Sequence, residues 1–178
     1  MARLTENDEL TDSLNYTDVK ADHWAANYIR IVTKHGYFNG FEDGTFRPEA
    51  PVTRGELVAV MARFLKLNVS TPNELHFNDI EGHWAAASIE ELYRSKYLAG
   101  YPDGSFKPQN NIIRSEAVTL VNRMLYRGPL KGLNPLFPDV NASHWAFGDV
   151  QEATISHEAN RNADGSETWQ KNIEDKVR

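Results

Sequence analysis

The residues of this sequence best able to do chemistry recur in three copies of the tripeptide His-Trp-Ala. Three related histidines could share a metal ion, but none has a carboxylate or a second histidine three or four residues further on, so a hydrogen-bonded histidine at a helix start is favoured. We expect the tryptophans to pack mainly in the core, with an exposed edge that could stack on a sugar. The copies are almost evenly spaced along the chain, at His23-Trp24-Ala25, His83-Trp84-Ala85 and His144-Trp145-Ala146.

Arg54 and Arg114 each stand at the first position of an expected helix, where a cation meets the positive end of the helix dipole. A cation is unfavourable there unless an anion lies nearby. Both arginines are therefore candidates for binding a carboxylate, with bidentate contact as the best geometric match. Two alternatives stay open, namely a solvated arginine and an ion pair within the chain to Asp43 or Asp103.

An Asp-Gly pair comes after each of the three histidines, at the same spacing in every copy. The glycine allows a positive φ and the aspartate can close an Asx-turn, so each pair predicts a turn. A calcium loop of the EF-hand kind fails in the first copy, because Phe41 and Ala50 would fall at ligand positions. The pairs are Asp43-Gly44, Asp103-Gly104 and Asp164-Gly165, and an Asp before Val or Ile also recurs, at Asp18, Asp79 and Asp139.

Motifs typical of enzymes do not occur in the sequence, which has no G-x-S-x-G, no H-E-x-x-H and no glycine-rich phosphate loop. Paired carboxylates for glycoside cleavage stay an open alternative, since acidic residues are plentiful. Catalysis needs one asymmetric site, whereas the notable residues here are repeated. Repetition favours several similar, weak binding sites whose avidity adds. We therefore expect no enzyme activity, no cofactor and no metal ion.

The spacing of apolar residues predicts an all-α fold made of three helix–loop–helix units. Asp22 is expected to cap the first helix and Gly36 to end it. Thr53-x-x-Glu56 predicts a capping box for the second helix, which Ile113 weakens in the second copy. The apolar positions are Trp24, Tyr28, Ile31 and Val32; Leu57, Val60, Met61, Phe64 and Leu65; Trp84, Ile89 and Leu92; Ala117, Leu120, Val121, Met124 and Leu125; Val150, Ala153, Thr154 and His157; and a short last helix on Trp169, Ile173 and Val177.

The chain of 178 residues divides into a polar extension at 1–15 and repeats at 16–66, 77–126 and 137–178, which we expect to pack into one domain. A net charge of −6 argues against nucleic acid as a partner. The absence of cysteine excludes zinc fingers, iron–sulfur clusters and disulfides. No apolar run is long enough for a transmembrane segment, and the first ten residues lack a signal-peptide core, so a signal is expected to have been cleaved or left out.

These motifs together resemble the S-layer homology repeat of bacterial surface proteins. The second copy matches almost throughout, with Phe77-Asn78-Asp79-Ile80, Gly100-Tyr101-Pro102-Asp103-Gly104-Ser105-Phe106-Lys107-Pro108 and Arg114-Ser115-Glu116. The first copy matches at Asp43-Gly44 and Thr53-Arg54-Gly55-Glu56. The third copy keeps only the front half and has Glu174 where the motif arginine would fall.

The resemblance implies a pseudo-threefold spindle of three units around a central helical bundle, and an extracellular domain that anchors its parent protein non-covalently to the cell wall. It implies an anionic secondary cell-wall polysaccharide as ligand, often carrying a pyruvate ketal, in grooves between units. Alternatives are direct peptidoglycan binding and a protein–protein role in surface-layer assembly. Carried over, Arg54 and Arg114 would take the anion, Asp43-Gly44 and Asp103-Gly104 would shape the groove loops, and Trp24, Trp84 and Trp145 would lie in or beneath the sugar contacts. Tyr101 is a further candidate for stacking on the sugar.

Overall fold

A computed structural model describes residues 14–174 of the chain, which divide into two compact units. Within the described range, the first unit comprises residues 14–92 and 100–111, and the second comprises residues 93–99 and 112–174. Each unit has buried apolar side chains of its own. The predicted polar extension at 1–15 lies almost wholly outside the described residues, and the predicted repeat boundaries stay predictions.

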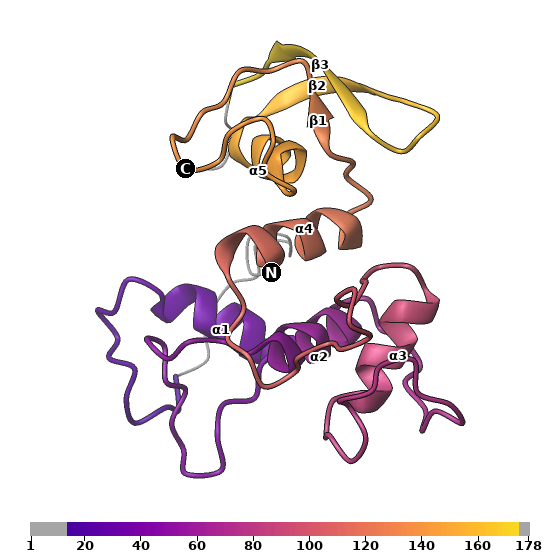
Figure 1. Cartoon of the computed structure of the whole chain (residues 1–178). Coiled ribbons are helices and arrows are strands. Elements are labelled where there is room, and N and C mark those ends of the chain that lie inside the picture. The colour runs from indigo at the N-terminus through magenta and orange to yellow at the C-terminus, as the bar shows by residue number, and fades with distance from the viewer. Residues whose placement is uncertain (1–13, 175–178) are drawn as a thin grey trace. The chain divides into compact units, whose positions relative to one another are not determined.

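Helices α1 (Ala26–Lys34), α2 (Arg54–Phe64) and the greater part of α3 (Ala86–Arg94) belong to the first unit, joined by long loops (Figure 1). All three confirm helices that the apolar spacing predicted. The most completely buried part of the unit is the middle of α2, where Val58, Ala59, Val60, Met61 and Ala62 are each at most 5% exposed. Burial of this apolar run stabilises the unit by removing hydrocarbon from water.

The predictions for the ends of these helices are confirmed at Thr53 and Gly36 and wrong at Asp22. Thr53 and Glu56 form the predicted capping box, with the Thr53 hydroxyl accepting from the Glu56 amide at 3.2 Å and Glu56 accepting from the Thr53 amide at 2.7 Å. Gly36, with a φ of +69°, follows the end of α1 as predicted. The prediction that Asp22 caps α1 is wrong. Nδ1 of His23 accepts the Ala25 amide at 3.2 Å instead, so an imidazole binds one of the unpaired amides.

The second unit combines helices with a small sheet. Helices α4 (Arg114–Met124) and α5 (Phe147–Thr154) pack on each other, and the strands are β1 (Leu130–Lys131), β2 (His157–Arg161) and β3 (Glu167–Asn172) (Figure 1). The strand order is β1-β3-β2, with β1 parallel and β2 antiparallel to β3. The side-chain amide of Asn122 on α4 also donates to the backbone carbonyl of Asp149 on α5 at 2.9 Å.

The prediction of an all-α fold with three helix–loop–helix units is therefore wrong, and with it the expected three-fold bundle of helix pairs. Trp169, expected on a helix, lies in β3 opposite Ala159, and His157 is the first residue of β2. Ile173 follows β3, while Val177 lies outside the described residues.

The third copy forms a hairpin because of the residues that come after its Asp-Gly turn. Four residues after the turn glycine, the first two copies have Pro48 and Pro108, which carry no amide hydrogen for strand pairing. The third copy has Trp169 at that position, a residue that favours strands. The chain can therefore pair with β2 at once instead of running on as a loop to a second helix.

None of the helices found between residues 14 and 174 has the length and apolar character needed to cross a membrane.

Candidate functional site

The three repeated tryptophans lie on the surface of the described structure. Trp24 is 77% exposed, Trp84 is 63% exposed and Trp145 is 61% exposed. Each follows a histidine whose ring centroid lies 5.5–5.7 Å from the indole centroid. The expectation that these side chains pack mainly in the core is therefore wrong, and three flat apolar faces are open to solvent.

The reason for this exposure lies in the preceding histidine. In every copy Nδ1 of the histidine accepts the amide two residues on, at 3.2 Å from Ala25, 3.1 Å from Ala85 and 3.2 Å from Ala146. The alanine after each tryptophan is buried, whereas the tryptophan itself is exposed to solvent. The prediction of a hydrogen-bonded histidine at a helix start is confirmed.

The Asp-Gly pairs form the same turn three times, as predicted. Asp43, Asp103 and Asp164 each accept both the amide and the hydroxyl of the residue two positions on, at 2.9–3.0 Å and 2.5–2.6 Å respectively. The glycines that follow have φ between +77° and +81°. Hydrogen bonds from the Thr45 hydroxyl, Arg47 and the Thr45 amide lower the pKa of Asp43 to about 2.

Asp18 and Asp79 hold the loop beyond each turn, a role that the sequence did not suggest. The Asp79 carboxylate accepts the Phe106 amide at 2.8 Å and the Lys107 amide at 2.7 Å. Asp18 accepts the Phe46 and Arg47 amides at the same distances. The recurrence of an Asp before Val or Ile was the signal that could have revealed it. These contacts lower the pKa of Asp18, chiefly through the Phe46 amide.

Arg54 is buried in the loop of the second copy. Arg54 is only 5% exposed, and its Nε donates to the Phe106 carbonyl at 2.8 Å. The guanidinium carbon lies 4.6 Å from the ring centroid of Phe106 and 4.8 Å from that of Tyr101. The alternative of a solvated Arg54 is therefore wrong. The aromatic pair supports the cation that the helix dipole disfavours.

Arg114, the equivalent residue of the second copy, is exposed and lines a cavity of about 300 Å³ in the second unit. Phe137, Asp139 and His144 of the third copy lie in the same lining. Where the second copy has Tyr101 and Phe106, the third has Asn162 and Glu167, so Arg114 lacks an equivalent aromatic pair. The two arginines thus have the same place in the repeat but different surroundings.

Trp84 forms a wall shared by two cavities of the first unit. One, of about 490 Å³, is also lined by Phe41, Arg47 and Arg63, and the other, of about 510 Å³, by Arg63 and Lys66. An exposed indole beside several cations is an arrangement that suits an anionic sugar. Sequence reasoning missed Arg63, which donates to the Tyr37 carbonyl at 3.0 Å. Its recurrence as Arg123, at the equivalent place of the second copy, was the available signal.

The structure thus brings some of the residues predicted as a site together and leaves others apart. Arg54, Tyr101, Asp103 and Gly104 gather at the loop of the second copy, and Trp84 lies at the cavities beside the loop of the first. Arg114 lines the cavity of the second unit. Trp24 and Trp145 are exposed, and Asp43 and Gly44 form the turn of the first copy.

Comparison with known proteins agrees with these repeats. The family model of the S-layer homology domain matches residues 15–58 and 76–118. This chain therefore contains two S-layer homology domains. The third His-Trp-Ala copy lies outside both matched segments.

Three relatives show the setting in which such sequence occurs. The chain is 46% identical to cell surface glycoprotein 1 of Acetivibrio thermocellus over 80% of its length and 42% identical to the cellulosome-anchoring protein of that organism over 87%. It is 29% identical to exoglucanase XynX of the same species over 81% of its length. The chain spans only 7%, 36% and 14% of these three proteins.

Proposed function

We propose that this chain is a non-catalytic module that holds a surface protein on the bacterial cell wall, outside the cell, by binding an anionic wall polysaccharide. The two S-layer homology domains support this, as do relatives named as a cell-surface glycoprotein and a cellulosome-anchoring protein. One relative is named as an exoglucanase, of which the chain spans only 14%, so its catalytic activity is not carried over to the chain.

The observation that carries the proposal is the exposure of three tryptophans at equivalent places in the repeat. An exposed indole costs free energy in water unless a partner covers it, and a sugar ring presents a flat C–H face that suits the indole. Three such contacts on one chain would add their affinities, as a polymeric ligand with repeated units requires. A polysaccharide satisfies both conditions.

The cations beside these indoles favour a ligand that carries negative charge. Arg114 is exposed at a cavity, and Arg63 lines both cavities at Trp84. A guanidinium binds a carboxylate, such as that of a pyruvate ketal, with two parallel hydrogen bonds. Asp139 lies in the lining with Arg114, so an anion would have to approach from the arginine side. Arg54 would contribute charge from beneath Tyr101.

The test is a binding assay of the chain with purified wall sacculi. Arg114→Ala is expected to weaken binding about tenfold or more, since a hydrogen bond to a charged group contributes about 1.5–3 kcal/mol. Trp84→Ala should weaken it as well, whereas Lys171→Ala, which removes an exposed cation paired with Glu158 on the hairpin, should leave it unchanged. Unchanged binding in an Arg54→Ala, Arg114→Ala double variant that keeps its circular dichroism would contradict the role of the arginines. Concentration-dependent oligomers without wall affinity would favour an assembly module.

A further inference from the structure

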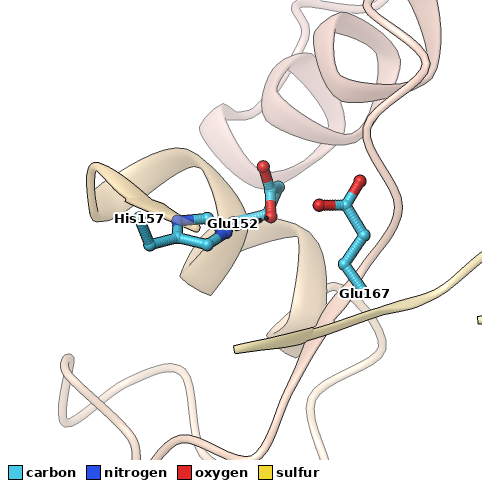
Figure 2. A group of neighbouring side chains, drawn as sticks. All are labelled: Glu152, His157 and Glu167. Carbon is cyan, nitrogen blue, oxygen red and sulfur yellow. Dashed lines mark ion pairs between the residues drawn. The ribbon is translucent and has the colours of Figure 1, made fainter. Parts of the chain in front are cut away.

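Three ionisable side chains meet in the interior of the second unit, away from the tryptophans. Glu152 comes from α5, His157 begins β2 and Glu167 begins β3, and all three are buried (Figure 2). One potential ligand atom from each lies within 4.8 Å of the others. Among residues 14–174 this is the one group of three that could hold a metal ion.

The histidine is oriented toward the carboxylates by the backbone. Its Nδ1 lies 2.6 Å from the Ile155 carbonyl oxygen, a contact that places the ring hydrogen on Nδ1. The lone pair of Nε2 then faces Oε2 of Glu152 at 3.1 Å. Both atoms are buried, and neither makes a hydrogen bond of acceptable geometry. Two facing lone pairs repel unless a cation or a proton lies between them.

The charges of the group lead to the same requirement. Nη2 of Arg127 lies 2.5 Å from Glu152 and 3.5 Å from Glu167, and the Gly128 amide donates to Glu167 at 3.0 Å. Two carboxylates and one guanidinium leave one negative charge in a buried place. An uncompensated buried charge is costly, so a further positive charge is expected in the group.

We propose that Nε2 of His157 and a carboxylate oxygen from each of Glu152 and Glu167 bind a divalent transition-metal ion, with Zn²⁺ as the expected ion. One imidazole and two carboxylates form a donor set that Zn²⁺ accepts, with water in the fourth position. Ca²⁺ and Mg²⁺ take oxygen ligands and would not use the imidazole. The contact from Nδ1 to a carbonyl is the outer-shell arrangement that orients a metal-binding histidine.

The ion would join α5 to the hairpin of the third copy. The sequence did not suggest it, because Glu152, His157 and Glu167 are irregularly spaced and lie on three different elements. The three repeated histidines lie elsewhere, and none has a carboxylate or a second histidine three or four residues further on. The competing account of the same geometry is a doubly protonated His157 that forms a simple ion pair with Glu152.

Titration of the full chain with Co²⁺ and with Zn²⁺ tests the proposal. We expect visible Co²⁺ absorption bands typical of a tetrahedral site, displacement of Co²⁺ by one equivalent of Zn²⁺, and a higher unfolding temperature with Zn²⁺ than with a chelator. His157→Gln and Glu167→Gln should lower the affinity at least about tenfold. The matched controls are Glu158→Gln, next to His157 on β2, and His35→Gln, which removes an exposed histidine of the first unit.

Two results would overturn the metal site. The first is the absence of saturable binding by a folded wild-type chain, together with ¹⁵N spectra that show protons on both nitrogens of His157. The second is binding that His157→Gln leaves unchanged, which would place the ion at another histidine. If a glutamine variant fails to fold, the Co²⁺ spectrum and the ¹⁵N spectrum of the wild type still decide between the ion and the proton.

Discussion

The Nε of Arg54 donates a hydrogen bond of 2.8 Å to the Phe106 carbonyl, and its guanidinium lies 4.6 Å from the Phe106 ring. These two residues are 52 positions apart and belong to different copies of the repeat. The first turn of α2 in the first copy is therefore held by the Asp-Gly loop of the second. One copy supplies the cation and the next supplies the aromatic side chains around it.

Phe106→Ala should destabilise the first unit, because the ring is fully buried and its loss leaves a cavity beside Arg54. We expect a loss of about 3–5 kcal/mol in the free energy of unfolding, measured by urea denaturation. Phe41→Ala removes an exposed ring from the first copy and should cost less than about 1 kcal/mol. Equal effects of the two changes would contradict the role of Phe106.

The capping box offers a reciprocal pair of substitutions. Thr53→Ala removes the hydroxyl that accepts the Glu56 amide and should destabilise the chain by about 1 kcal/mol. Ile113→Thr supplies the missing hydroxyl at α4, where Glu116 already accepts the residue 113 amide at 3.2 Å. Because Ile113 is 57% exposed, little burial is lost and a gain of about 0.5–1 kcal/mol is expected. Thermal unfolding of both variants checks the pair, and a destabilised Ile113→Thr variant would argue against this cap.

Gly128 should not accept a side chain. A Cβ atom at this position would lie 1.9 Å from the Gly165 carbonyl oxygen, which is backbone and cannot move aside without shifting the hairpin turn. We expect Gly128→Ala to cost about 1–3 kcal/mol, measured by denaturation of the chain. The control is Gly165→Asn in the same turn, where a Cβ meets no atom within 4 Å and asparagine tolerates the φ of +81°. If Gly128→Ala leaves the free energy of unfolding unchanged, the close approach of Gly128 to the Gly165 turn is contradicted.

The acid stability of the chain should depend on the Asp-Gly turns. Asp43 has a folded pKa of about 2, below the value of about 3.9 expected in an unfolded chain. Its contribution to stability is therefore present above about pH 4 and is lost as the pH falls toward 2. An NMR titration of the Asp43 carboxyl measures this directly, and Asp43→Asn should flatten the decline. A midpoint near 4 in the folded chain would contradict the hydrogen bonds from Thr45 and Arg47.

Several local elements could be predicted from sequence signals, although the fold class could not. The helices α1 to α4, the capping box at Thr53 and the three Asp-Gly turns all follow from residues close together in the chain. The hairpin of the third copy could not be predicted by analogy with the other two. Its outcome depends on strand pairing between residues 157–161 and 167–172, and the repeat pattern contains no such pairing to extrapolate from.

The surroundings of the candidate site residues could not be predicted from the sequence, and their role as a site stays a prediction. Repetition identified the tryptophans and arginines, but their burial depends on tertiary contacts. Trp84 is outside because His83 binds the helix amide and Ala85 enters the core. Arg54 is buried because Tyr101 and Phe106 are brought to it from the next copy. Arg114 is exposed, and the third copy has Asn162 and Glu167 at the sequence positions of Tyr101 and Phe106.

We propose that the chain anchors its parent protein through a wall polysaccharide. The most direct measurement compares binding of the full chain to intact sacculi and to sacculi stripped of polysaccharide, with the Trp24→Ala, Trp84→Ala, Trp145→Ala triple variant alongside. We predict saturable binding of the wild type to intact sacculi, its loss on stripped sacculi, and weak binding of a folded triple variant to both. Equal binding of the wild type to intact and stripped sacculi would contradict the claim and indicate peptidoglycan as the ligand.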